Sequence, residues 1–235
     1  MSALYRKYRP QKFEDVIAQQ HITRTLVNQI EKGKITHAYL FTGSRGTGKT
    51  TCARIFARAI NCLSPENGSP CGKCEVCKAL SGGNIDIIEL DAASNNGVDQ
   101  IREIVDNVAY PPVAGKYKVY IVDEVHMLSG AAFNALLKTL EEPPAHAVFV
   151  LATTEVHKLP ATVLSRCMRF DFRLVPAPVL KEHLKKIYAA EGVKAEDSAL
   201  DLIVAAAEGS VRDMLSVADR CMNYSDNLSY GDVLG

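Results

Sequence analysis

One stretch of this sequence, residues 43–50, constrains the fold more than any other feature. It reads GSRGTGKT, which fits the phosphate-binding loop pattern G-x-x-x-x-G-K-[ST] at every specified position. An apolar run at 38–41 precedes the loop, and residues 51–60 after it carry apolar side chains at helical spacing. Because the pattern requires a strand, a glycine-rich loop and a helix in that order, the sequence predicts a phosphate-binding loop rather than an ordinary glycine turn.

The predicted loop supplies three kinds of group to a phosphate. Its glycines let backbone N–H groups turn inward where a Cβ would obstruct them, and the helix that follows presents the positive end of its dipole. Lys49 places a charge at the β- and γ-phosphates, and the hydroxyl of Thr50 is a ligand for Mg²⁺. The candidate nucleotide-binding residues of this stretch are Gly43, Ser44, Arg45, Gly46, Thr47, Gly48, Lys49, Thr50 and Thr51.

Another apolar run, residues 118–122, ends in two carboxylates, Asp123 and Glu124. At the tip of a strand beside a phosphate-binding loop, one carboxylate can hold Mg²⁺ through its waters and the other can polarise an attacking water. We assign the first role to Asp123 and the second to Glu124. Thr154 follows the apolar run 147–152, and it is either an ordinary residue at a strand end or a hydrogen-bonding group for the water or the γ-phosphate. The candidate catalytic residues are therefore Lys49, Asp123, Glu124 and Thr154.

Four of the seven cysteines are clustered, with the spacing C-x8-C-x2-C-x2-C. Four thiolates close a tetrahedral zinc shell, and the prolines and glycines of this segment let the sulfurs converge. The alternative is an iron–sulfur site, but the ferredoxin run that begins C-x2-C-x2-C continues with x3-C-P, and this sequence does not. Since four sulfur ligands leave no open coordination position, we expect a structural zinc site. Its ligands are Cys62, Cys71, Cys74 and Cys77.

Alternating strands and helices with continuous apolar strands predict an α/β fold, a parallel sheet covered by helices on both faces. The expected strands are 38–41, 85–90, 118–122, 147–152 and 168–172. The composition changes at Val-Pro-Ala-Pro, 175–178, beyond which we expect only helices, at about 178–191, 198–208 and 210–222. The sequence therefore predicts a nucleotide-binding domain at 1–175, with a zinc module at 62–77, and a small helical domain at 176–235.

Composition and charge exclude several classes of protein. The formal net charge is zero, with 27 basic and 27 acidic residues, which does not favour tight autonomous binding to DNA. The sequence holds no run of about eighteen apolar residues, and its N-terminus lacks the apolar segment of a secretory signal. We therefore expect a cytoplasmic protein with no membrane contact. The odd number of cysteines argues against a disulfide scaffold.

With these motifs in place, the chain resembles the AAA+ ATPases of the clamp-loader type, and in particular the family of tau/gamma subunits of bacterial DNA polymerase III. The resemblance covers the whole chain, and the cysteine insertion after the loop helix is typical of this family. The segments that carry it are Tyr8-Arg9-Pro10, the four clustered cysteines, DEVHMLS at 123–129, LLKTLEEPP at 136–144, LSRC at 164–167 and GSVRD at 209–213.

The resemblance implies roles for two arginines. Arg166 matches the arginine finger, which acts in trans on the γ-phosphate bound by a neighbouring subunit. From the residues alone, Arg166 is an ordinary cation at a helix end. Arg212 matches the sensor of the helical lid domain, which touches the nucleotide in its own subunit.

The resemblance also implies a segment that packs on the adenine. In this sequence it corresponds to Arg9-Pro10 and to the region from Val16 to Ile22, and its candidate binding residues are Arg9, Pro10, Val16 and Ile22. The chain departs from the family at Ala18, where glycine is usual, and the departure concerns backbone contacts to the base rather than the phosphate chemistry.

The function that the resemblance implies is that of a motor subunit. ATP binding would close a five-membered ring of clamp-loader subunits around primer-template DNA and open the sliding clamp, and hydrolysis would release both. The expected cofactors are ATP, Mg²⁺ and Zn²⁺. The family's subunit carries a further collar domain, so we expect this chain to be a fragment that is monomeric in isolation.

Two other functions compete with this one. The first is an ATP-sensing scaffold that binds nucleotide without hydrolysing it, and the presence of Asp123, Glu124 and Arg166 argues against it. The second is a zinc-dependent nucleic-acid module. The zero net charge and the lack of a basic stripe around residues 71–77 argue against it.

Overall fold

The computed structural model describes residues 3–82, 85–95, 97–225 and 227–234. The elements up to residue 171 are α1 (Leu4–Lys7), the 3-10 turn η1 (Phe13–Asp15), α2 (Gln20–Glu31), β1 (Ala38–Thr42), α3 (Lys49–Ala59), α4 (Glu75–Gly82), β2 (Ile87–Asp91), α5 (Val98–Val108), β3 (Lys118–Asp123), η2 (Val125–Met127), α6 (Gly130–Glu141), β4 (Ala147–Thr153), η3 (Val156–Lys158), α7 (Ala161–Leu164) and β5 (Met168–Asp171). Those that follow are α8 (Ala177–Glu191), β6 (Lys194–Ala195), α9 (Asp197–Ala206), α10 (Val211–Tyr224), β7 (Asn227–Leu228) and α11 (Tyr230–Leu234).

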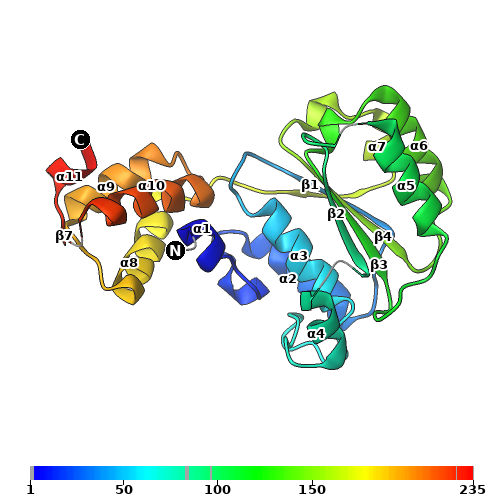
Figure 1. The fold of residues 1–235 in the computed structure, drawn as a ribbon, viewed down its shortest axis with the longest axis horizontal. Helices are drawn as coiled ribbons and strands as arrows, with labels where there is room; N and C mark the ends of the chain where they lie inside the picture. The colour runs from blue at the N-terminus through cyan, green and yellow to red at the C-terminus, as the bar shows by residue number, and fades with distance from the viewer. Residues whose placement is uncertain (1–2, 83–84, 96, 226, 235) are drawn as a thin grey trace.

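A parallel sheet in the order β2-β3-β4-β1-β5 forms the centre of the larger part of the molecule (Figure 1). Helices α5 and α6 cover one face of this sheet, and α2 and α3 cover the other. The predicted α/β fold with a parallel sheet is therefore confirmed. The second predicted strand begins two residues later than expected, at Ile87, although the Asp86 carbonyl oxygen already accepts a hydrogen bond from the Val119 N–H of β3 at 2.8 Å.

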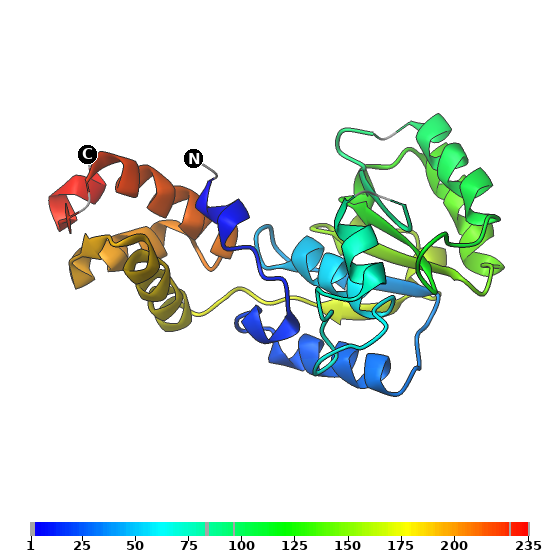
Figure 2. The same cartoon turned by 60° about the horizontal axis from the view of Figure 1, so that its bottom comes forward.

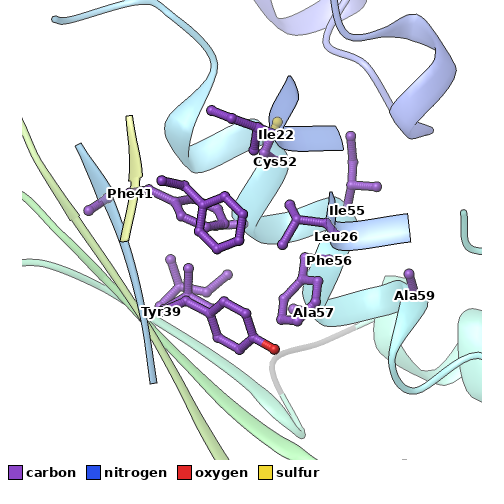
Figure 3. Close-up of a cluster of buried hydrophobic side chains, with 14 of the residues drawn as sticks. Ile22, Leu26, Tyr39, Phe41, Cys52, Ile55, Phe56, Ala57 and Ala59 are labelled. Atoms are coloured by element: carbon purple, nitrogen blue, oxygen red, sulfur yellow. The ribbon is translucent and has the colours of Figure 1, made fainter. Parts of the chain in front are cut away.

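The central strands bury both of their faces, and their side chains alternate between two cores. In β1, Tyr39 and Phe41 pack with α2 and α3, whereas Ala38 and Leu40 pack with α5 and α6. Figure 3 shows Tyr39 and Phe41 directed at α3, where the rings of Tyr39 and Phe56 lie 4.6 Å apart. Complete burial of an aromatic side chain stabilises a fold by about 1.5–3 kcal/mol, so these contacts stabilise the packing of α3 on the sheet.

The part beyond residue 176 is mainly helical but contains one pair of strands. Lys194 and Ala195 of β6 pair in parallel with Asn227 and Leu228 of β7. The expectation of helices alone was therefore wrong at these residues. Two-residue strands are too short to show the alternation that identifies a strand in a sequence. Among the described residues, no helix is both long enough and apolar enough to cross a membrane.

The N-terminal helix α1 packs on this helical part rather than on the sheet (Figures 1 and 2). Leu4 is buried among the helical residues, Lys7 pairs with Glu191 at 2.6 Å, and the Tyr8 hydroxyl donates to the same carboxylate. The chain thus begins in the helical part, crosses to the sheet, and returns through residues 172–176.

The carboxylate of Asp86 anchors the loop that leads into β3. It is fully buried and accepts hydrogen bonds from the backbone N–H groups of Val113, Ala114 and Gly115, each at 2.7 Å. An ionised acceptor strengthens such bonds. Asp86 therefore fixes the entry to the strand that carries Asp123.

We predict that Asp86→Asn lowers the free energy of unfolding by about 1.5–3 kcal/mol, because an amide NH₂ then faces a backbone donor in a buried site. Chemical denaturation measures this change. The control is Asp106→Asn on α5, an exposed carboxylate whose replacement should cost about 0.5 kcal/mol or less. Equal stability of the two variants would contradict the anchoring role.

Candidate active site and cysteine cluster

The loop 43–50 joins β1 to α3, as its sequence predicts, and two of its glycines are required by close packing. A Cβ on Gly43, at a φ of +139°, would lie 2.5 Å from the Phe172 carbonyl oxygen. A Cβ on Gly46, at a φ of +74°, would lie 1.9 Å from the hydroxyl of Ser210 at the start of α10. The Val211 N–H donates to the Gly46 carbonyl oxygen at 3.1 Å. The helical part therefore rests directly on the loop.

The Lys49 side chain is folded into this loop. Its Nζ donates to the carbonyl oxygens of Gly43 at 2.7 Å and Ser44 at 2.9 Å. Burial lowers the pKa of Lys49 from its ordinary value, and the carboxylates of Glu124 and Asp123 counteract part of that shift. Among the described residues, Nζ is hydrogen-bonded to carbonyl oxygens of the loop and not to a carboxylate, so its positive charge is available to an anionic ligand.

Thr50 and Asp123 bring the loop helix and β3 together. The Thr50 hydroxyl donates to Asp123 Oδ2 at 2.5 Å, and Asp123 Oδ1 accepts from the Glu124 N–H at 2.9 Å. Hydroxyl and carboxylate oxygens are the donor set that Mg²⁺ prefers, usually with several waters retained. These two residues therefore fit the predicted magnesium site.

Glu124 lies beside the end of β4. Its Oε2 accepts from the Thr154 N–H at 3.2 Å and from the Thr154 hydroxyl at 2.9 Å. Thr154 is therefore a hydrogen-bonding residue, but its partner is the Glu124 carboxylate. The sequence had suggested a water or the γ-phosphate as the partner.

A cleft between the sheet and α10 contains most of the predicted nucleotide-binding residues. They are Arg9, Pro10, Val16, Arg45, Gly46, Thr47, Gly48, Lys49, Thr50, Thr51, Asp123 and Arg212. Ile22 does not line this cleft, because it points into the core formed with α3. Gly43 and Ser44 contribute through their carbonyl oxygens to Lys49.

The cleft also contains residues to which the sequence analysis assigned no role in binding, among them Tyr5, Tyr8, His183 and Leu215, whereas Ile17 belongs to the predicted adenine segment. The two tyrosines alternate with basic residues near the N-terminus, and that interleaving was a usable signal. Tyr5 lies under the Arg212 guanidinium, 5.4 Å from its ring centroid, in a cation–π contact. His183 and Leu215 are ordinary helix residues with no signal of their own.

Ala18 occupies the position where the related family usually has glycine, and its φ is +57°. A side chain in this left-handed region costs about 1–2 kcal/mol. The neighbouring Gln19 holds the segment in place, since its amide pairs with both the C=O and the N–H of Arg173, at 2.7 and 3.2 Å. The Gln19 amide also donates to the Thr47 carbonyl oxygen at 3.3 Å. The cleft is therefore retained despite the departure at Ala18.

Arg166 lies at the opposite end of the sheet from the loop. It pairs with Glu141 at 2.8 Å, donates to the Thr162 carbonyl oxygen at 2.7 Å, and borders a second cleft near the start of β1. The five residues of β1, about 17 Å at 3.3 Å each, separate this position from the loop. Arg166 is therefore not brought together with the other predicted catalytic residues of its own chain.

The four clustered cysteines converge as predicted. Their Sγ atoms all lie within 4.8 Å of one another, and those of Cys62 and Cys74 are 4.0 Å apart. A tetrahedral zinc shell with Zn–S bonds of about 2.3 Å places its sulfurs about 3.8 Å apart, so the cluster fits zinc. Backbone N–H groups, that of Lys73 first, lower the pKa of Cys71 to about 6, whereas burial raises the pKa of Cys77 to about 12. The loop thus stabilises a thiolate at Cys71 before any metal arrives.

Two family models match consecutive parts of the chain. The model described as "DNA polymerase III, delta subunit" matches residues 18–176. The model described as "DNA polymerase III clamp loader subunit, ATPase lid domain" matches residues 179–227. The boundary between the two matches coincides with the crossing from β5 to α8.

Similar curated proteins are subunits of the same enzyme. The chain is 54% identical to DNA polymerase III subunit tau of Bacillus subtilis (strain 168) over 99% of its own length and 40% of the relative's. It is 48% identical to subunit tau of Escherichia coli (strain K12) over 95% of its own length and 35% of the relative's. The chain therefore spans 40% or less of these relatives.

Among solved structures, Thermotoga maritima RuvB, described as a Holliday junction branch migration motor, has a similar fold. The TM-score is 0.71 at 20% identity, over 97% of this chain and 71% of that one. At this identity the likeness concerns the fold alone.

We predict that Cys74→Ser abolishes stoichiometric zinc binding, because one of four sulfur ligands is replaced by a hydroxyl. Nucleotide affinity should be retained, since the eleven residues of α3, about 16 Å, lie between the cluster and the loop. Metal analysis and calorimetry measure the two properties, with Cys221→Ser as the control outside the cluster. Iron in the wild type, or undiminished zinc in Cys74→Ser, would contradict the assignment.

Proposed function

The chain belongs to the family of DNA polymerase III clamp-loader subunits and has the AAA+ fold, and on this premise we propose that it binds and hydrolyses ATP to load a sliding clamp onto primed DNA. The observation that carries the proposal is the convergence of Lys49, Thr50, Asp123 and Glu124 at one edge of the sheet, with Arg212 facing them across the cleft. The names tau and tau/gamma of the similar proteins support the same function for the chain.

The domain organisation that we propose separates the sheet, with the cores on its two faces, from the helical part, which has a core of its own. Residues 1–175 form the nucleotide-binding domain, with the zinc module at 62–77, and residues 176–235 form the lid domain. The lid-domain match at 179–227 supports the second assignment. The packing of α1 on the lid adds the N-terminal residues to the surface that contacts the nucleotide.

Binding of ATP would replace contacts that the loop now makes with itself. Lys49 would exchange the carbonyl oxygens of Gly43 and Ser44 for the β- and γ-phosphates, and the oxygens of Thr50 and Asp123 would hold Mg²⁺. Mg²⁺, when bound, neutralises charge that develops on the phosphates. Arg212 contacts the phosphates from the lid, and so couples lid position to the presence of nucleotide.

Hydrolysis would depend on the carboxylate of Glu124. It accepts a proton from the water that attacks the γ-phosphorus, and the leaving oxygen remains on ADP. Thr154 orients this carboxylate through the two hydrogen bonds that it already donates. The site is completed only by a second subunit, because Arg166 lies too far from its own loop and serves as the finger for a neighbour.

The partners that we propose are the other subunits of a five-membered clamp-loader ring, the sliding clamp and primer-template DNA. The family match supports assembly with other subunits of the holoenzyme. An ATP-sensing scaffold that does not hydrolyse nucleotide is the alternative, and turnover of the wild-type assembly distinguishes the two.

We predict that Glu124→Gln lowers ATP turnover by about 10²- to 10⁴-fold, the usual contribution of a general base, while ATP-dependent clamp binding persists. The assay uses the parent subunit assembled with its clamp-loader partners, the clamp and primed DNA. Glu103→Gln on α5 is the control, an exposed carboxylate of the same size. Lys49→Ala should instead abolish nucleotide binding.

The wild-type assembly itself separates the two functions. Turnover that clamp and primed DNA stimulate supports the motor, whereas nucleotide binding without turnover supports the scaffold. A Glu124→Gln assembly with wild-type turnover would remove Glu124 from the role of base.

We predict that Arg166→Ala leaves the ATP affinity of the isolated chain unchanged and removes most turnover of the assembled loader. An arginine finger supplied by another subunit contributes about 10³- to 10⁵-fold in GTPases, which sets the scale of the loss. Arg169→Ala is the control, a neighbouring exposed guanidinium that pairs with Asp171. A variant whose isolated turnover falls as steeply as that of the assembly would place Arg166 in its own site.

A further inference from the structure

His126 is a buried histidine close to the proposed catalytic centre, and none of the roles above uses it. It lies in η2, two residues after Glu124, within the segment DEVHMLS. Only 6% of its side chain is exposed, so its two ring nitrogens must find partners inside the protein.

The two nitrogens of His126 face two different carboxylates. Nδ1 lies 3.0 Å from the Thr153 hydroxyl and 3.4 Å from Glu124 Oε2. Nε2 lies 3.0 Å from Glu155 Oε2. The ring therefore lies between the carboxylate of Glu124, directly after β3, and the carboxylate of Glu155, which follows β4.

Glu155, which contacts Nε2 of the ring, is itself held in place by other residues. The Lys158 Nζ donates to Glu155 Oε2 at 2.8 Å, and this contact holds the pKa of Glu155 below its ordinary value. Glu155 is therefore an ionised acceptor for the imidazole. Its backbone N–H donates to the Thr153 hydroxyl at 3.0 Å, and Thr153 is fully buried at the end of β4.

The orientation of the Glu124 carboxylate depends on the residues around it. Glu124 has a φ of +48°, directly after β3, so its side chain leaves the strand by a sharp turn of the backbone. Its Oε2 is contacted by Thr154 and by His126, and both partners are fixed to the end of β4. Among the residues that the structure describes, Thr154 and the His126 ring are thus the two groups in close contact with this oxygen.

We propose that His126 is a positioning residue for ATP hydrolysis, which orients the Glu124 carboxylate through Nδ1 while Glu155 fixes the ring through Nε2. The inference rests on the proposed function, in which Glu124 polarises the attacking water. His126 is not among the residues that line the cleft, and in this role it acts only through Glu124.

Three replacements of His126 test the two sides of the ring separately. In His126→Ala, turnover of the assembled loader should fall at least about tenfold but by no more than the 10²- to 10⁴-fold that a general base contributes, with unchanged ATP affinity of the chain. The amide nitrogen of His126→Asn reaches about as far as Nδ1, and that of His126→Gln about as far as Nε2. His126→Asn should therefore restore most of the turnover, and His126→Gln should restore less.

The controls separate positioning from damage to the fold. His157→Ala removes an exposed histidine of η3 that lies in the electrostatic field of the same Glu155, and it should keep wild-type turnover. The unfolding midpoint of each variant and calorimetry with a non-hydrolysable ATP analogue show whether the fold and the nucleotide site remain intact. Since the Asn and Gln variants keep a polar group in the cavity, they test the inference even if the Ala variant unfolds.

A double variant tests whether His126 acts through Glu124. In the Glu124→Gln background, His126→Ala should cause little further loss, because the group that it orients has already been removed. A further loss of the same size as in the wild-type background would show an independent role and overturn the inference. So would His126→Gln restoring turnover as well as His126→Asn does.

These outcomes are separate from those that test the proposed function. Turnover of the wild-type assembly and its loss in Glu124→Gln test the function itself. If both hold and His126→Ala retains wild-type turnover, only the positioning role of His126 is wrong.

Discussion

The parallel alignment of β3, β4 and β1 is the constraint on which every proposed catalytic contact depends. The three strands lie side by side, with Thr42 beside Thr153 and Val122 beside Leu151, so their carboxyl ends meet at one edge. The phosphate-binding loop, the Asp123-Glu124 pair and the Thr153-Thr154 pair all begin at this edge. Short side chains are therefore enough to join them, as the contact between Thr50 and Asp123 shows. A different strand order would keep every motif intact and separate the groups in space.

The parts of the site that could be predicted are those whose chemistry is local in the sequence. The loop 43–50 and the four cysteines are each recognised by residue type and spacing within one short stretch of the sequence. The contact between Thr154 and Glu124 depends on β4 pairing directly with β3, which no local pattern encodes. The placement of Ile22 failed for a related reason. A sequence segment assigned to the adenine does not separate residues that face the cleft, such as Ile17, from residues of α2 that face the core.

The contacts that sequence analysis missed are made largely between side chains and distant backbone. Asp86 and Gln19 are polar residues beside predicted elements, with nothing in their neighbourhood to mark them as buried. Each is satisfied by N–H or C=O groups at least 27 residues away, 154 residues in the case of Gln19 and Arg173. Such groups become partners only after the fold has formed. They also explain how the segment around Ala18 tolerates a left-handed backbone without glycine, because the neighbouring amide secures it to two other segments.

The packing of α1 on the lid means that the lid is tethered twice. One tether is the N-terminal stretch between α1 and α2, and the other is the stretch 172–176 between β5 and α8. The Gln19 amide joins the second tether at Arg173 to the end of the first. A body on a single tether can swing and twist freely, but a body on two tethers that are pinned together moves chiefly about one axis. The two segments therefore restrain how the helical part, with Arg212, can be displaced relative to the loop.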